Sequence, residues 1–305
     1  GTLPPKDAVR IEEMINYFDY DYPTPDAQTP SPLRVSYEQA PAPWNSTHQL
    51  LRIGLKTKPL DLSNTPPSHL VFLIDISGSM ADYNKLPLLK SSLKLLLSNL
   101  KAGDKVSIVT YASGTRVALE PTSVREREKI EKILDGLEAG GATSGEQGIQ
   151  LAYEQAHKAF IKGGNNRIIL ATDGDFNIGI SNPNDLKAFI EKQREGGVYL
   201  SVLGFGMGNY RDDMAETLAD SGNGNYAYID NLTEAKKVLV NEFGGTLFTV
   251  AKDVKLQIEF NPKYVKQYKL LGYENRMLAN EDFTNDKKDA GEIGAGHTVT
   301  AIYEI

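Results

Sequence analysis

The chain contains no cysteine among its 305 residues. Disulfide bonds, thiolate metal sites and cysteine nucleophiles are therefore excluded. It also has no apolar run near the ~20 residues that a membrane-spanning helix needs. The longest run, residues 70–74, has the length of a strand.

Basic residues are outnumbered by acidic ones, with 33 Lys and Arg against 40 Asp and Glu and a net charge of −7. An acidic chain without a basic block repels phosphate backbones, so we expect no nucleic-acid partner.

Both ends of the chain indicate a longer native protein. The chain begins with Gly1 rather than methionine, and residues 297–305 alternate like a strand up to the final position. We expect further residues on either side, and any signal peptide or lipid anchor would lie upstream. The content of 40% hydrophobic and 24% charged residues is ordinary for a globular protein. A chain of this length can bury a full core as one large domain or two smaller ones.

The middle of the chain alternates between strand and helix patterns. Residues 70–74 and 168–171 are wholly apolar, as in central parallel strands that are buried on both faces. Apolar residues at helical spacing, with polar residues at the starts, predict helices over residues 86–100, 123–137, 144–160, 184–194, 212–220 and from 231 onward. This alternation predicts an α/β fold with a doubly wound, mostly parallel sheet.

The two flanks of this middle region have a different pattern. A short amphipathic helix is predicted within residues 4–18, and a proline-rich linker follows it. Strands are predicted over residues 33–37, 49–55, 254–260, 268–271 and 298–302. Strands without crossover helices cannot extend a parallel sheet, so we expect these to form a smaller antiparallel β-sandwich. The predicted domains are an N-terminal helix and linker (1–32), a β-rich accessory domain (33–63 plus 251–305) and an inserted α/β domain (64–250).

Polar side chains follow both of the wholly apolar strands. Asp75, Ser77 and Ser79 come directly after the first strand, and alternate residues of an extended segment point to the same side. Asp173 follows the second strand, and a glycine loop delivers the hydroxyl of Thr143 just ahead of a helix. Open α/β sheets bind ligands at this carboxyl edge, where the strand order reverses. Carboxylates and hydroxyls without His or Cys are hard oxygen donors, suited to Mg²⁺, Mn²⁺ or Ca²⁺.

These three loops resemble those of the von Willebrand factor A (VWA) domain, in which they assemble a metal-ion-dependent adhesion site (MIDAS). The resemblance consists of a DxSxS motif at residues 75–79, a Thr in a Gly-Gly loop at 140–144, and Thr-Asp-Gly at 172–174. It implies that Ser77, Ser79 and Thr143 contact a metal ion through their hydroxyls, and that Asp75 and Asp173 act directly or through water. Mg²⁺ is the first expectation, with Mn²⁺ or Ca²⁺ as alternatives.

The flanks are similar to those of YfbK-like bacterial VWA proteins, in segments 4–20, 272–276 and 291–305. The resemblance implies a protein-binding module of the adhesion type, displayed in a bacterial cell envelope. It would be periplasmic or surface-exposed, with a lipid anchor as one option. The protein partner, expected around Gly78, Gly141 and Gly174, presents an Asp or Glu that completes the metal's shell. We expect the chain to be a monomer. The alternative is a soluble, intracellular VWA scaffold that serves a partner ATPase.

The sequence contains no complete motif of the enzyme classes that we considered. A haloacid-dehalogenase-type phosphatase needs a second Asp where this chain has Ser77. There is no GxxxxGK[ST] phosphate loop and no GxSxG nucleophile elbow. Gly204, Gly206 and Gly208 form GxGxG rather than the GxGxxG of a dinucleotide site, so a plain turn is favoured there. The four histidines are scattered, and residues 280–289 lack EF-hand spacing. We therefore expect no enzymatic activity and no catalytic residues.

Overall fold

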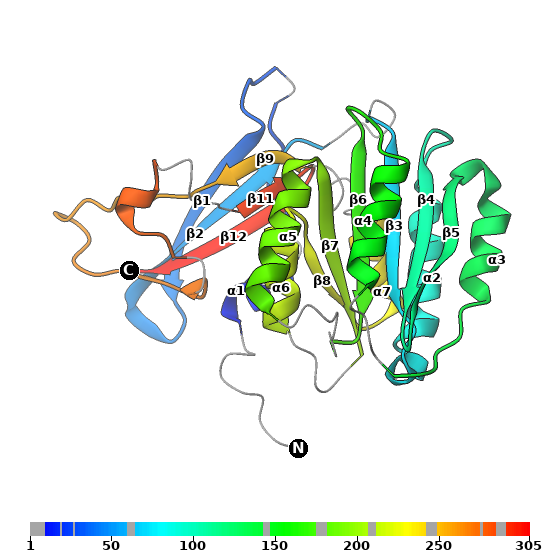
Figure 1. Cartoon of the computed structure of the whole chain (residues 1–305). Coiled ribbons are helices and arrows are strands. Elements are labelled where there is room, and N and C mark those ends of the chain that lie inside the picture. Colours follow the sequence, from blue (N-terminus) through cyan, green and yellow to red (C-terminus); the bar gives the residue numbers. More distant parts are fainter. Residues whose placement is uncertain are drawn as a thin grey trace. The chain divides into compact units, whose positions relative to one another are not determined.

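The structure is a computed structural model that describes residues 10–18, 20–26, 28–59, 65–142, 147–174, 182–206, 212–241, 249–274, 277–284 and 291–305. The chain divides into two compact units. Unit 1 combines Gly1–Leu60 with Phe248–Ile305, and unit 2 is Asp61–Leu247. Figure 1 labels the elements of both units. Among the described residues, no helix combines the length and the apolar character needed to cross a membrane.

Unit 2 is built on one six-stranded sheet. Its strands are β3 (Ser68–Asp75), β4 (Lys105–Tyr111), β5 (Thr115–Ser123), β6 (Asn165–Thr172), β7 (Val198–Phe205) and β8 (Tyr226–Ile229). Their order in the sheet is β5-β4-β3-β6-β7-β8. All neighbours are parallel except β4 and β5, which pair antiparallel at one edge. The predicted mostly parallel α/β fold is therefore confirmed.

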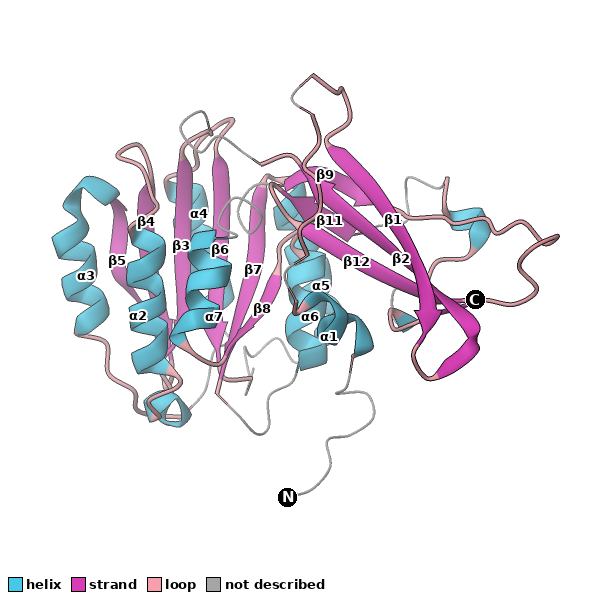
Figure 2. Cartoon of the chain, turned by 180° about the vertical axis from the view of Figure 1, so that it is seen from behind, coloured by secondary structure: helices cyan, strands magenta, loops and turns pink. Residues whose placement is uncertain are grey.

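Helices cover both faces of this sheet. They are α2 (Leu86–Leu97), α3 (Arg127–Asp135), α4 (Gly148–Lys158), α5 (Pro183–Glu195), α6 (Asp212–Ser221) and α7 (Leu232–Lys236), the last continued by a π-helix over Lys237–Asn241. Helices α4, α5 and α6 lie on one face, and α2, α3 and α7 lie on the other (Figures 1 and 2). Every residue of β3 and β6 is buried between these layers. The core sits here because each strand contains an uninterrupted apolar run, residues 70–74 in β3 and 168–171 in β6.

Some of the helices begin at the capping residues that the sequence predicted, and others do not. Asn231 caps α7, since its Oδ1 accepts hydrogen bonds from the backbone N–H groups of Thr233 and Glu234. Ser123 caps a 3₁₀ turn over Val124–Glu126, and α3 begins only after this turn. The predicted start of a helix at residue 144 lies outside the described residues.

Unit 1 combines strands from both ends of the chain. It contains α1 (Ile11–Asn16), β1 (Leu33–Ala42), β2 (Asn45–Thr57), β9 (Thr249–Val254), β10 (Lys269–Leu270), β11 (Gly291–Gly294) and β12 (Thr298–Glu304). Strands β1-β2-β12-β10 form an antiparallel sheet in that order, and β9 pairs with β11 in a second, two-stranded sheet. The pairing of β2 with β12 joins the flanks, as predicted.

One predicted strand of unit 1 is wrong. Residues 254–260 alternate like a strand, but β9 ends at Val254 and the chain is irregular from 255 to 260. Phe260 is held instead by ring contacts, with its centroid 4.4 Å from that of Tyr268 and 5.5 Å from that of Tyr303. Aromatic packing therefore covers this apolar side chain without a strand ladder.

Candidate functional site

The candidate site lies where the order of the six-stranded sheet reverses. The chain leaves β3 toward β4 on one side and later enters β6 on the other side of β3. Ile74 of β3 is in register with Ala171 of β6. The two strands therefore end together, and the loops that follow them begin at the same carboxyl edge. This is the position at which open α/β sheets place their ligand sites.

The first loop is organised around the buried carboxyl group of Asp75. The backbone N–H of Ser77 donates to Asp75 Oδ1 at 2.8 Å, and the Thr172 hydroxyl donates to Oδ2 at 3.4 Å. The Oγ atoms of Ser77 and Ser79 lie 3.0 Å apart. Ser77 is buried and Ser79 is exposed. The extended segment thus turns both hydroxyls to one side, as the DxSxS spacing predicted.

The glycine loop lies directly against the DxSxS loop. The N–H of Gly78 donates to the carbonyl of Gly141 at 3.0 Å, and the N–H of Gly140 donates to the carbonyl of Ile76 at 2.8 Å. Gly141 has φ +83°, and a Cβ at this position would lie 2.4 Å from Ser113 Oγ, so only glycine fits. The structure therefore brings the predicted glycines at 78 and 141 together. Thr143 lies outside the described residues.

The third loop supplies Asp173, whose side chain is only 3% exposed. Its Oδ1 atom is buried and has no hydrogen-bond partner among the described residues. Gly174, with φ +96°, continues the chain and donates its N–H to the Thr172 hydroxyl at 3.2 Å. The structure thus places four of the five predicted ligand residues at one edge: Asp75, Ser77 and Ser79 of the first loop, and Asp173 of the third. Within the described part of the chain, one carboxylate oxygen there lacks a partner.

The electrostatics of the site disfavour two unpaired carboxylates. The pKa of Asp75 is raised to about 6, chiefly by burial; the nearby charge of Asp173 contributes to the increase, and hydrogen bonds from Ser77 oppose it. Burial also raises the pKa of the neighbouring Tyr111 hydroxyl, and the charge of Asp75 adds to this effect. The phenol is therefore neutral at pH 7. A positive charge at this edge would stabilise both carboxylates.

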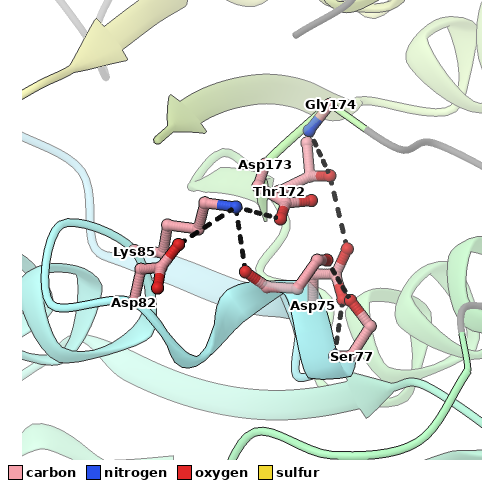
Figure 3. A network of polar contacts seen from close by, with 8 residues as sticks. Asp75, Ser77, Asp82, Lys85, Thr172, Asp173 and Gly174 are labelled. Atoms are coloured by element: carbon pink, nitrogen blue, oxygen red, sulfur yellow. Dashed lines mark hydrogen bonds and ion pairs between the residues drawn. The ribbon is translucent and has the colours of Figure 1, made fainter. Parts of the chain in front are cut away.

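The described part of the chain supplies one such charge, which the sequence interpretation missed. Lys85 Nζ lies 2.9 Å from Asp173 Oδ2 and donates to the carbonyl of Ser79 at 2.9 Å (Figure 3). Asp82 Oδ2 is 4.0 Å from the same ammonium. A signal was present: Lys85 occupies the N-cap position of α2, where the helix dipole disfavours a cation. The contact with Asp173 could not be predicted, because it depends on the path of the long lysine side chain past Gly206.

The donor set fits a hard cation rather than a transition-metal centre. Within the described ranges, no three His, Cys, Asp or Glu side chains gather as a metal-binding group. The site instead offers the carboxylates of Asp75 and Asp173 and the hydroxyls of Ser77 and Ser79. Oxygen donors of this kind suit Mg²⁺, Mn²⁺ or Ca²⁺. The buried Asp173 Oδ1, to which no described residue donates a hydrogen bond, is the observation that favours such an ion here.

Three family models match the chain. The model described as "von Willebrand factor type A domain" matches residues 69–241, which is more than half of the chain. A second model, "von Willebrand factor", matches residues 1–52. A third, "Uncharacterized protein YfbK, C-terminal", matches residues 245–305. The three matches together leave only short gaps in the chain.

Curated relatives and solved structures agree with these matches. "Uncharacterized protein YfbK" of Escherichia coli (strain K12) is 51% identical over 310 residues, which cover 100% of this chain and 54% of the relative. "Uncharacterized protein sll0103" of Synechocystis is 30% identical, covering 67% of this chain and 47% of the relative. The chain thus spans about half the length of these relatives. A structure of von Willebrand factor type A from Catenulispora acidiphila shares the fold, with a TM-score of 0.53, 16% identity, and coverage of 92% of this chain and 66% of that one.

Proposed function

The chain belongs to the von Willebrand factor type A family, and we propose that it is a metal-dependent protein-binding module. VWA domains are in general protein-interaction modules rather than enzymes. In the proposed mode of action, a divalent cation at the carboxyl edge of the six-stranded sheet accepts an Asp or Glu of a protein partner. Mg²⁺ is the first candidate, and Mn²⁺ or Ca²⁺ are alternatives.

One observation carries this proposal. The carboxylates of Asp75 and Asp173 and the hydroxyls of Ser77 and Ser79 converge from two loops, and Asp173 Oδ1 is buried without a partner among the described residues. A buried carboxylate oxygen without a partner is costly, and coordination of a cation would remove this cost.

Each residue of the site has a distinct part in the proposed mechanism. Asp75, which is held by Ser77 N–H and the Thr172 hydroxyl, orients the first loop and contributes charge. Ser77, Ser79 and, by the family resemblance, Thr143 would hold the ion through neutral oxygens. Asp173 would contribute the charge from the facing loop. Neutral donors leave a bound cation with more attraction for an incoming carboxylate than charged donors would, so the partner's Asp or Glu supplies the last ligand.

A thermal titration tests the metal site. We expect Mg²⁺ or Mn²⁺ to raise the Tm of the parent protein, because ligand binding to the folded state stabilises it. A Ser77→Ala/Ser79→Ala double variant should not respond. Ser91→Ala/Ser98→Ala is the matched control, since it removes two exposed hydroxyls from the region of α2 away from the site. An equal response of the Ser77/Ser79 variant and the parent would remove the metal assignment.

A binding experiment tests the partner chemistry. Proteins retained by the immobilised full-length protein in Mg²⁺ should elute with EDTA, and replacing the contacting Asp or Glu of a partner by Asn or Gln should abolish retention. Retention that is insensitive to EDTA would contradict the proposal. Retention of an ATPase as the EDTA-sensitive partner would favour the intracellular scaffold instead. Placement in the cell envelope belongs to the same proposal, and fractionation of cells expressing the full-length protein tests it.

A further inference from the structure

We infer that Lys85 is a built-in counter-ion of this site, whose ammonium competes with a metal ion for Asp173 and sets the affinity for metal. This inference rests on the proposed function, because it concerns the same carboxylate. It adds a residue that the DxSxS, Thr and Asp motifs do not contain. It also implies that loading the site releases a side chain from the start of α2.

The contacts of Lys85 lie on the residues proposed to hold the metal. Its Nζ donates to Asp173 Oδ2 and to the carbonyl of Ser79, both at 2.9 Å. The side chains of Lys85 and Asp173 are 14% and 3% exposed. The ammonium therefore bridges the DxSxS loop and the Asp173 loop, as a metal ion at this edge would. A paired charge that is this buried is firmly held, because breaking the pair leaves a buried carboxylate uncompensated.

The stem of Lys85 is placed by the backbone at the end of β7. Gly206, with φ +88°, follows β7, and a Cβ added there would lie 2.5 Å from Lys85 Cε. The stem of Lys85 thus passes directly over the backbone of Gly206. A side chain on any other residue at position 206 would displace the lysine. Helix stability does not explain this arrangement, because a cation at the N-terminus of α2 opposes the helix dipole. The compensating interaction is the one with Asp173.

Two cations at Asp173 would repel each other in this buried setting. Metal binding therefore requires the ammonium to leave Asp173. The described structure offers a second partner on the exposed side, because Asp82 Oδ2 lies 4.0 Å from Nζ and its side chain is 72% exposed (Figure 3). Lys85 can turn toward Asp82 without losing all charge compensation. The affinity for metal is then the intrinsic affinity of the oxygen donors reduced by the cost of this exchange.

Mn²⁺ binding to the whole protein, measured by calorimetry, tests the inference. We expect Lys85→Met to bind Mn²⁺ about tenfold to a hundredfold more tightly than the parent, which corresponds to the strength of a charged hydrogen bond. Lys94→Met is the matched control. Lys94 lies on the same helix and pairs at 2.6 Å with Asp135, whose side chain is 59% exposed, so its loss should change Mn²⁺ affinity less than about twofold.

A second readout does not involve metal. In EDTA, Lys85→Met should melt at a lower temperature than the parent, because Asp173 loses its counter-ion, and saturating Mn²⁺ should reverse the order. Gly206→Ala retains the charge of Lys85 but displaces its stem, so it should also tighten Mn²⁺ binding. This variant decides the question if Lys85→Met does not fold.

The outcomes separate this inference from the proposed function. Normal Mn²⁺ binding by the parent, with equal or weaker binding by Lys85→Met and Gly206→Ala, would overturn the role of Lys85 and leave the proposed function standing. Absence of Mn²⁺ binding from the parent and from every variant would overturn both. Tighter binding by both variants, with Lys94→Met unchanged, supports the inference.

Discussion

The central sheet of unit 2 and the four-stranded sheet of unit 1 are stabilised in different ways. All eight residues of β3 and all eight of β6 are buried. In β1, only the last of ten residues is buried. Unit 2 therefore relies on apolar packing of both sheet faces, whereas unit 1 relies more on individual polar contacts. One example is the hydrogen bond of 2.9 Å between the hydroxyls of Tyr22 and Thr300.

This difference explains why the candidate site is in unit 2. A sheet that is buried on both faces ends in a region of low dielectric constant, so carboxylates at its edge are poorly solvated and interact strongly with any cation. The raised pKa of Asp75 is a direct result of this burial. On a largely exposed strand such as β1, water would screen the same pair of carboxylates.

The largest expected effect comes from breaking the buried sheet. Phe72 is fully buried in β3, so Phe72→Ala should lower the free energy of unfolding by about 3–5 kcal/mol, through lost burial and the cavity left behind. Tyr37 on β1 is 82% exposed, so Tyr37→Ala should change it by no more than about 0.5 kcal/mol. Hydrogen exchange followed by mass spectrometry can report on each unit. Similar losses from both substitutions would refute the contrast between the sheets.

A smaller effect, of opposite sign, is expected at Asp75. In EDTA at pH 7.5, Asp75→Asn should raise the free energy of unfolding, because it removes a buried charge and keeps an oxygen that can accept from Ser77 N–H. The raised pKa of about 6 corresponds to a gain on the order of 2–3 kcal/mol. Urea denaturation measures the change. The same variant should lose its Mn²⁺ response, and a stabilised variant that kept this response would contradict the assignment of Asp75.

The pH dependence of the parent gives a control for this variant. Because the folded state raises the pKa of Asp75, it binds this proton more tightly than the unfolded state does. The contribution of Asp75 to stability is therefore present at low pH and is lost as the pH rises from about 4 to about 6. His69 acts oppositely, since burial lowers its pKa to about 4 and stability is lost as the pH falls below 6.5. Of these two effects, only that of His69 should persist in metal-free Asp75→Asn, and a pH profile identical to that of the parent would refute the cause given for the Asp75 shift.

The buried sheet was also the part that could be predicted best. The two wholly apolar runs led correctly to β3 and β6, and their ends led to Asp75 and Asp173. The contact of Lys85 with Asp173 could not be predicted, because it depends on strand order and on the path of a long side chain past Gly206. The error at residues 254–260 arose because alternation shows which residues are apolar but not how they are buried: Phe260 packs against the rings of Tyr268 and Tyr303, and Leu256 is 46% exposed. The role of Thr143 stays a prediction.

The smallest expected effect tests the polar contacts of unit 1. Asn16, at the end of α1, accepts a hydrogen bond from Thr300 N–H at 2.7 Å and donates to the Thr300 carbonyl at 3.2 Å. Asn16→Ala removes both bonds to β12, so it should destabilise the contact between α1 and β12 by about 1–2 kcal/mol. The amide of Thr300 should then exchange about tenfold faster, while amides of β3 keep the parent rate, because local opening in unit 1 does not require the core of unit 2 to open. Faster exchange in β3 as well would mean that the two sheets lose structure together, and the contrast between them would then concern only burial and not stability.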